Sequence, residues 1–227
     1  MKGWGGSAKR HRLTLFLHKG AFDVCLIQET KKANIDDFMI QYLWGYKDVN
    51  WVVKEPDGLS GVSQVMGFLG ISVDREGYVL HIVNVYSPCI FSGKKKLWNN
   101  LLNLKQQNSV GEWCVEGDVN AILLPKERIG SSSFSRQNER ISFNRFVEEM
   151  KLIDVPVLGK KFSWFSADGK SMSQIDRFLL SDGLFSKYGI SDQWIGDRDI
   201  SDHCPICSIV TTKNWGPKPF RVINGCL

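Results

Sequence analysis

The spacing of apolar residues alternates along the chain between the period of a helix and that of a strand. Helical spacing predicts four helices, over residues 7–20, 34–45, 94–107 and 138–150. Runs rich in β-branched and aromatic residues predict strands over residues 22–27, 48–54, 67–73, 78–86, 112–117, 161–166, 173–181, 190–195 and 206–210. The run at 78–86 is the clearest strand, because it is β-branched and ends at a Ser-Pro pair.

These predicted strands and helices are mixed without strict alternation. A single doubly wound parallel sheet would need regular alternation, so the order favours an α/β (α+β) protein with two mixed sheets flanked by helices. The 227 residues suit one domain of this kind. A turn at 167–170, which contains Gly169, is expected to join the strands around it as a hairpin.

The composition indicates where in the cell the protein is expected. Hydrophobic residues make up 43% of the chain, enough for a substantial core, but no run is long and apolar enough to span a bilayer. Basic residues at 9–12 interrupt the N-terminal region before any signal-like segment begins. The six cysteines are scattered, several within apolar runs, which is typical of reduced, buried thiols. We therefore expect an intracellular protein, nuclear or cytoplasmic.

The charge of the chain permits a phosphate-bearing partner without requiring one. The 29 basic and 24 acidic residues give a net charge of +5, with basic clusters at 9–12 and 94–96. Such clusters are more often solvated helix faces than binding sites. Cys204 and Cys207 have the spacing of a metal or redox pair, but without a second pair we interpret them as structural.

Polar residues that could carry chemistry stand at the ends of predicted strands. Each alone would more often be an ordinary loop residue, since loops hold most polar groups. A single histidine would more often be structural, and a single asparagine would more often bond its own turn. The residues are Glu29, Asp118, Asn120, Asp176, Asp202 and His203.

Asp176 is the least easily explained of these residues. It lies in an apolar strand, and a buried carboxylate without a partner costs several kcal/mol. Arg177 points to the opposite face of the strand, so it is a poor partner. A histidine would satisfy Asp176 and would gain a fixed tautomer in return.

Together the residues suit hydrolysis of a phosphodiester. That reaction needs a divalent metal on hard oxygen ligands, a base for the attacking water and donors for the charge on phosphorus. The predicted roles are Mg²⁺ binding by Glu29 and Asp202, proton abstraction by Asp118, donation to the phosphoryl oxygens by Asn120, and stabilisation of the phosphorus by His203 charged through Asp176.

Five short motifs occur in an order that resembles the endonuclease/exonuclease/phosphatase superfamily. They are "LIQETK" (26–31), "NVYSP" (84–88), "GDVN" (117–120), "QIDRFLLS" (174–181) and "SDHCPI" (201–206). The chain resembles most closely the endonuclease domain of plant non-LTR retroelements, on "PKER" (125–128), the long segment 141–181 and "WGPKPFRVIN" (215–224). The resemblance spans nearly the whole chain.

The resemblance implies a four-layer α/β sandwich with the site where strand ends of two sheets meet. It implies a monomeric, Mg²⁺-dependent endonuclease, with Mn²⁺ as a possible substitute, that nicks DNA and leaves a 3′-hydroxyl to prime reverse transcription. It assigns Glu29 and Asp202 to the metal. It further implies that Tyr86 contacts phosphate and that Ser163 touches the DNA backbone.

Two departures from the family pattern lead to further expectations. The chain begins at a "GLG"-like turn near Gly6, so we expect the first strand and its metal-side asparagine to be missing, and Mg²⁺ to bind more weakly with partial rescue by Mn²⁺. Val119 replaces the usual aromatic residue of the "GDFN" motif. We expect a truncated endonuclease domain over 1–211 and a tail over 212–227 that leads to a reverse transcriptase in relatives. The alternatives are an inactive remnant, either DNA-binding or inert, and a phosphatase for a small phosphoester.

Overall fold

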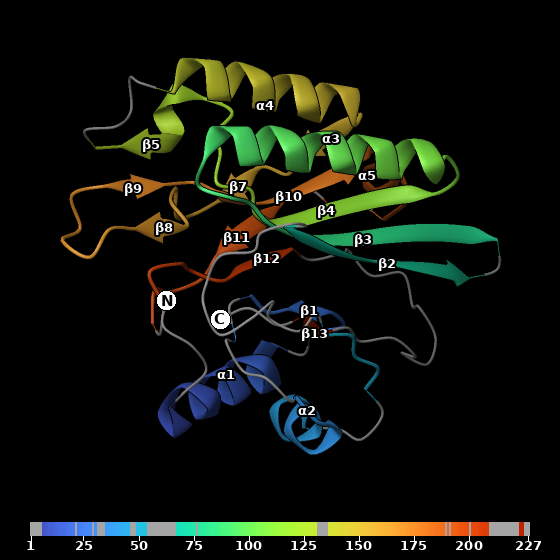
Figure 1. Cartoon of the computed structure of the whole chain (residues 1–227). Coiled ribbons are helices and arrows are strands. Elements are labelled where there is room, and N and C mark those ends of the chain that lie inside the picture. The colour runs from blue at the N-terminus through green and yellow to red at the C-terminus, as the bar shows by residue number, and fades with distance from the viewer. Residues whose placement is uncertain are drawn as a thin grey trace. The chain divides into compact units, whose positions relative to one another are not determined.

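The chain forms two compact units, which comprise residues 1–64 with 214–227, and residues 65–213. Figure 1 shows a computed structural model of the whole chain. The structure describes residues 6–20, 22–28, 30, 35–45, 49–53, 67–75, 77–130, 136–188, 190, 192–199, 201–208 and 223–224. Each unit has a hydrophobic cluster of its own. No helix within the described ranges is long and apolar enough to cross a membrane.

The smaller unit contains two helices and a pair of short strands. Its elements are α1 (Ser7–Gly20), β1 (Cys25–Leu26), α2 (Asp37–Trp44) and β13 (Ile223–Asn224), with β1 and β13 parallel. Helix α2 begins where the Asp36 carboxylate accepts the Met39 N–H at 2.8 Å, and it ends at Gly45 in the left-handed conformation. Leu17, Leu43 and other apolar side chains form the cluster between the helices.

The larger unit is built on a five-stranded mixed sheet. In spatial order its strands are β2 (Phe68–Arg75), β3 (Tyr78–Tyr86), β4 (Glu112–Asp118), β10 (Asp176–Ser181) and β6 (Leu152–Asp154). Strands β3 and β4 are parallel, and the other neighbours are antiparallel. The parallel pair requires a crossover, which one helix provides.

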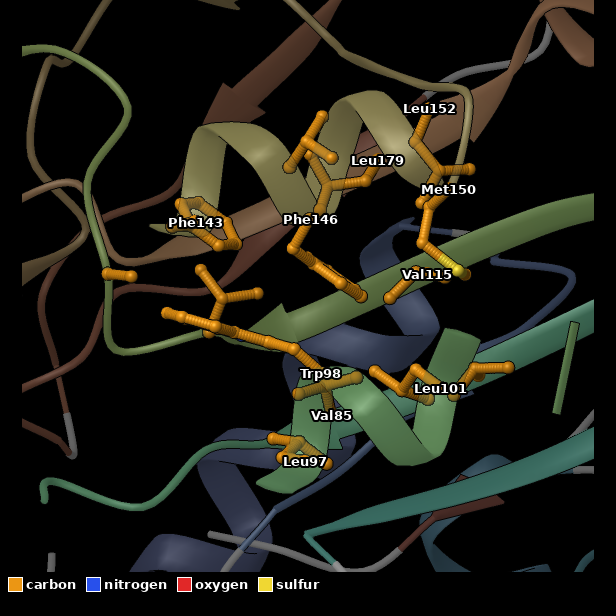
Figure 2. Close-up of a cluster of buried hydrophobic side chains, with 14 of the residues drawn as sticks. Val85, Leu97, Trp98, Leu101, Val115, Phe143, Phe146, Met150, Leu152 and Leu179 are labelled. Atoms are coloured by element: carbon orange, nitrogen blue, oxygen red, sulfur yellow. The ribbon is translucent and has the colours of Figure 1, made fainter. Parts of the chain in front are cut away.

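Two helices cover one face of this sheet, α3 (Phe91–Gln107) and α4 (Gln137–Glu149) (Figure 1). Figure 2 shows Trp98 of α3 and Phe146 of α4 in one cluster with Val85 and Val115 of the sheet. Alternate residues of a strand point to the same face, so Val83 and Val85 of β3 and Val115 of β4 all lie against the helices. Burying each such side chain stabilises the fold by about 1.5–3 kcal/mol.

Short elements complete the larger unit. A second mixed sheet has the order β12 (Ile206–Ser208), β11 (Gln193–Ile195), β7 (Val157–Leu158). A third, antiparallel sheet has the order β5 (Arg128–Ile129), β9 (Met172–Ser173), β8 (Trp164–Phe165). The remaining elements are the 3₁₀ helix η1 (Pro125–Glu127) and α5 (Asp182–Tyr188).

The predicted fold class is confirmed, since the protein is a mixed α/β molecule with several mixed sheets. Strand β3 has the predicted bounds, and α3 begins three residues earlier than predicted. The strand predicted over 48–54 is wrong at the described residues 49–53, which form no strand. The strand predicted over 173–181 is divided, because β9 pairs with β8 in the hairpin whereas β10 joins the large sheet. Within residues 212–227, where the sequence predicts a tail, Ile223 and Asn224 form β13.

Candidate active site

Three neighbouring strands bring three of the predicted site residues to one level of the sheet. Asp118 at the end of β4 is paired with Tyr86 of β3 on one side and with Asp176 of β10 on the other. Directly paired residues project from the same face of a sheet. Val85, Gly117 and other alternate residues lie on the face under α3 and α4, so the tyrosine and the two acids occupy the opposite face.

The turn after β4 joins Asp118 to Asn120. The Asp118 carboxylate accepts the backbone N–H of Asn120 at 2.8 Å, which is an Asx-type turn. Gly117 has a φ of 115° and Asn120 a φ of 47°, conformations that favour glycine and that asparagine tolerates better than most residues. The side-chain amide of Asn120 donates to Cys89 Sγ at 3.3 Å. The sequence "GDVN" therefore suits the backbone that places the acid beside the amide.

Asp176 and His203 form the pair that the buried position of Asp176 predicts. His203 Nδ1 lies 3.1 and 3.0 Å from the two carboxylate oxygens of Asp176. Arg177 points to the opposite face, as expected, where it bonds Asp154 at 2.7 Å and Glu127. The contact with Asp176 fixes Nδ1 of the imidazole, so Nε2 is the nitrogen available to a ligand.

Ser163 takes a different position from the one that the resemblance implies. Its side chain is completely buried, and its hydroxyl oxygen accepts the backbone N–H groups of Ile175 at 3.2 Å and Asp176 at 3.0 Å. Its carbonyl accepts the N–H of Cys204 at 2.7 Å. A direct contact with DNA would need an exposed hydroxyl, so this geometry corrects the expectation. Ser163 instead holds the start of β10 beside the segment that carries His203.

Trp164 is a site residue that sequence reasoning missed. Its indole N–H donates to Asp202 Oδ2 at 3.1 Å, and its backbone forms a bridge with His203. The next residue, Phe165, donates its N–H to the carbonyl of Asp202 at 3.0 Å. The signal in the sequence is a tryptophan directly after Ser163, in the segment "FSW" (162–164). The tryptophan fixes the orientation of the Asp202 carboxylate.

The pKa values of Asp118 and His203 are both raised within the cluster. Burial, with the Asp176 carboxylate nearby, raises the pKa of Asp118 to about 7, although His203 and the Asn120 N–H oppose the shift. Burial alone would lower the pKa of His203, but the carboxylates of Asp176, Asp118 and Asp202 outweigh it and raise that pKa to about 9. At neutral pH the imidazole is therefore charged, and Asp118 is close to its titration midpoint.

Glu116 is a second residue that sequence reasoning missed. It lies two residues before Asp118 on the same face of β4, and only 6% of it is exposed. Burial, and then the charge of Asp176, raise the pKa of this carboxyl to about 8. Within the described part of the chain, Glu116 Oε1 has no hydrogen-bond partner. The signal was an acid inside the otherwise apolar segment "WCVEG".

Of the two predicted metal ligands, the structure describes Asp202 but not Glu29. Met1 to Gly5, which precede the turn expected near Gly6, also lie outside the described residues. Asp202 is partly exposed. Partial burial alone would raise its pKa, but hydrogen bonds from its own backbone and from the Trp164 indole, together with the nearby charge of His203, lower that pKa, so the carboxylate is ionised at neutral pH. An ionised carboxylate is the kind of hard ligand that Mg²⁺ prefers. In the described ranges, no three His, Cys, Asp or Glu side chains form a group that could hold a metal.

Comparison with solved structures identifies the fold. No family model and no curated protein matches the chain. The chain is similar to an endonuclease/exonuclease/phosphatase family protein from Leptotrichia buccalis, with 10% identity and a TM-score of 0.55. The match covers 92% of this chain and 96% of the Leptotrichia chain. The chain thus has the fold of the endonuclease/exonuclease/phosphatase superfamily, as predicted.

A more particular similarity is to the endonuclease domain of TRAS1, a telomere-specific non-LTR retrotransposon. The match has 11% identity and a TM-score of 0.52, and it covers 65% of this chain. This chain spans 64% of that domain, which is less than two thirds of its length.

Proposed function

We propose that the protein is a Mg²⁺-dependent phosphodiesterase that nicks DNA, of the type found in non-LTR retroelements. One observation carries the proposal. The ends of β3, β4 and β10 place Tyr86, Asp118 and Asp176 on one face, and His203 is bonded to Asp176. The likeness to a retrotransposon endonuclease domain supports DNA as the substrate, and the net charge of +5 is compatible with it.

Asp118 is the proposed general base. A base works best when its pKa is close to the operating pH, and burial places the pKa of Asp118 at about 7. The Asn120 N–H fixes its carboxylate. Asp118 takes a proton from the attacking water, and the Asn120 amide is the proposed donor to a phosphoryl oxygen.

His203 is the proposed cation at the phosphate. Its Nδ1 is bonded to Asp176, so it presents Nε2–H to the developing negative charge on the phosphoryl oxygens. Asp176 keeps the imidazole charged and oriented, and Tyr86, on the same face, is a proposed hydroxyl donor to the same group. Together these residues are the proposed contacts that bind and orient the phosphate.

Asp202 and Glu29 are the proposed ligands of Mg²⁺, with Mn²⁺ as a substitute. The metal, when bound, supplies Lewis-acid polarisation of the phosphate. Within the larger unit, Trp164 orients the Asp202 carboxylate for such a role.

The test is conversion of supercoiled plasmid to the nicked form, with Mg²⁺ and with excess EDTA. We expect nicking with Mg²⁺ only, and none from an Asp118→Asn protein purified in the same way. A parallel assay with p-nitrophenyl phosphate separates the alternatives. Hydrolysis of the small ester without nicking would favour a phosphatase, and a folded chain that binds DNA but hydrolyses neither substrate would favour an inactive remnant. Nicking in EDTA, or by the Asp118→Asn protein, would contradict the mechanism.

A further inference from the structure

A completely buried lysine lies directly behind the proposed active-site turn. Lys94, in the first turn of α3, has no exposed surface. Its ammonium donates to the carbonyl oxygen of Asn120 at 2.5 Å and forms an ion pair with Glu139 of α4 at 2.9 Å. The basic cluster at 94–96 is therefore not one solvated face, because Lys95 and Lys96 are exposed whereas Lys94 is not.

Stability alone does not explain a lysine at this position. Burial lowers the pKa of Lys94, and Glu139 only partly offsets that effect. Well-packed apolar residues in place of a buried ion pair are often as stable or more stable. Lys94 is also surrounded by the apolar positions of α3, since Leu97 and Leu101 lie on its side of the helix. What an apolar side chain could not provide is a donor for the Asn120 carbonyl.

Asn120 needs such a donor because its backbone is in an unfavourable conformation. Its φ of 47° lies in the left-handed region, which persists in a non-glycine residue only when the surroundings hold it. The N–H of this residue bonds the Asp118 carboxylate, and its carbonyl bonds Lys94. Both backbone polar groups are thus used, and Lys94 supplies the contact from the helical side.

The rest of the turn is held separately from behind. Asn144 donates to the carbonyl of Leu123 at 3.1 Å, and the Glu127 carboxylate accepts the N–H groups of Leu123 at 2.8 Å and Leu124 at 3.2 Å. Arg177 in turn bonds Glu127. These contacts begin three residues after Asn120 and so do not hold Asn120 itself, whose carbonyl is bonded by Lys94.

We propose that Lys94 is a positioning residue, which through its bond to the Asn120 carbonyl keeps Asn120 and the attached Asp118 carboxylate in place for the reaction. The inference rests on the proposed function for its catalytic consequence, but its structural part stands without it. Lys94 does not touch the substrate. It acts through the backbone of Asn120.

The experiment compares four variants of the full chain. Lys94→Met removes the donor, and Lys94→Met with Glu139→Gln removes the donor without leaving a buried unpaired carboxylate. Glu139→Gln alone keeps the bond from Lys94 to Asn120. Lys105→Met is the matched control, because Lys105 is another α3 lysine whose ammonium donates to a backbone carbonyl, that of Met150.

Three quantities are measured for each variant: the midpoint of thermal unfolding, amide hydrogen exchange of residues 119–124 without substrate, and kcat and KM for plasmid nicking. We expect Lys94→Met to lower the midpoint and the double variant to recover most of it. Exchange in both should be at least about tenfold faster at 119–124, and kcat should fall about 10–100-fold at unchanged KM. Glu139→Gln and Lys105→Met should stay within about twofold of the parent in exchange and kcat.

Two outcomes overturn the proposal. If the double variant has the exchange and kcat of the parent protein, Lys94 only fills its site. If Glu139→Gln speeds exchange at 119–124 as much as the loss of Lys94, the effect belongs to the ion pair. Should the parent chain not nick DNA, the proposed function fails, whereas the exchange data still decide the role of Lys94. If Lys94→Met alone does not fold, the double variant, which leaves no unpaired buried carboxylate, decides between these outcomes.

Discussion

The two faces of strands β3, β4 and β10 differ most near the strand ends that carry the candidate active site. Under α3 and α4 lie Val83, Val115 and Leu179, which are almost completely buried among the helices. The opposite face also carries apolar side chains, but among them lie Asn84, Glu116 and, at the strand ends, the candidate active site. Both faces are closely packed, and the face away from the helices is the one that buries the carboxyl groups of the candidate site.

The difference indicates how a small number of strands can hold buried carboxyl groups that cost stability. Buried carboxyl groups with raised pKa values cost stability, because burial disfavours their charged form. The apolar face offsets that cost, since it fixes the same backbone from the other side. We therefore expect substitutions on the two faces to separate, with stability lost on one and turnover on the other.

The largest expected effect is on the apolar face. Phe143→Ala removes a completely buried ring that packs on Trp98 and should destabilise the protein by about 3–5 kcal/mol. Urea unfolding measures the free energy. At a temperature where the variant is folded, kcat should match the parent within a few-fold. A large loss of kcat in the folded variant would show that the two faces are not separable.

The next effect is on the polar face, at Asp176 and His203. Asp176→Asn and His203→Gln should each reduce kcat about 10²–10³-fold, since each disables the same donor to the phosphate. The double variant should lose little more than the more damaged single variant, because the two act as one unit. Plasmid nicking at saturating Mg²⁺ measures this. Losses that multiply would contradict a shared function.

A smaller effect concerns the pH dependence of stability through Glu116. The pKa of its carboxyl is raised in the folded protein to about 8, so the folded state holds a proton that the unfolded state releases near its ordinary value of 4.5. The stability from this group is complete below that value and is lost as pH rises through about 8. Glu116→Gln should therefore be more stable than the parent at pH 9, by roughly 1–4 kcal/mol, and similar to it at pH 4.

Thermal unfolding of both proteins between pH 4 and 9 tests this expectation, and Glu112→Gln, on the same strand and partly exposed, is the control. Equal pH profiles for Glu116→Gln and the parent would show that the pKa of the Glu116 carboxyl is the same in the folded and unfolded states.

The smallest effect is expected at Trp164. Trp164→Phe removes the indole donor to Asp202 Oδ2 and should raise the Mg²⁺ concentration for half-maximal nicking by about tenfold, with little change in kcat at saturation. A metal titration measures it, and Trp194→Phe is a control at a partly exposed tryptophan of β11. If the Mg²⁺ concentration for half-maximal nicking is unchanged, Asp202 is not a ligand of the metal.

The parts of the fold that the sequence predicts well are those in which local pattern and tertiary contact agree. Strand β3 is β-branched and buried on one face, so its bounds follow from the pattern alone. The segment at 48–54 shows the opposite case. Trp51 donates its indole N–H to Asp37 at 2.7 Å and packs with the cluster around α1 and α2. The apolar residues of this segment therefore anchor a loop and do not form a strand.

The candidate site was predictable to the same extent. The pairing of Asp176 with a histidine follows from the cost of a buried carboxylate, but the choice of Trp164 for Asp202 depends on a contact between distant segments. The burial of Lys94 could have been predicted from its spacing in the helix. It precedes Leu97 by three residues and Leu101 by seven, which puts it on the buried side of α3.

The order of the site residues along the chain has a consequence for protein synthesis. Tyr86, Lys94, Asp118 and Asn120 all belong to the continuous segment β3–α3–β4, whereas His203 lies 27 residues beyond its partner Asp176. A ribosome adds about 5–20 residues per second, so the carboxylates emerge seconds before the imidazole that pairs with them. A nascent chain can thus form the sheet and the turn while it still lacks the cation, and no nascent chain that ends before His203 contains the whole site.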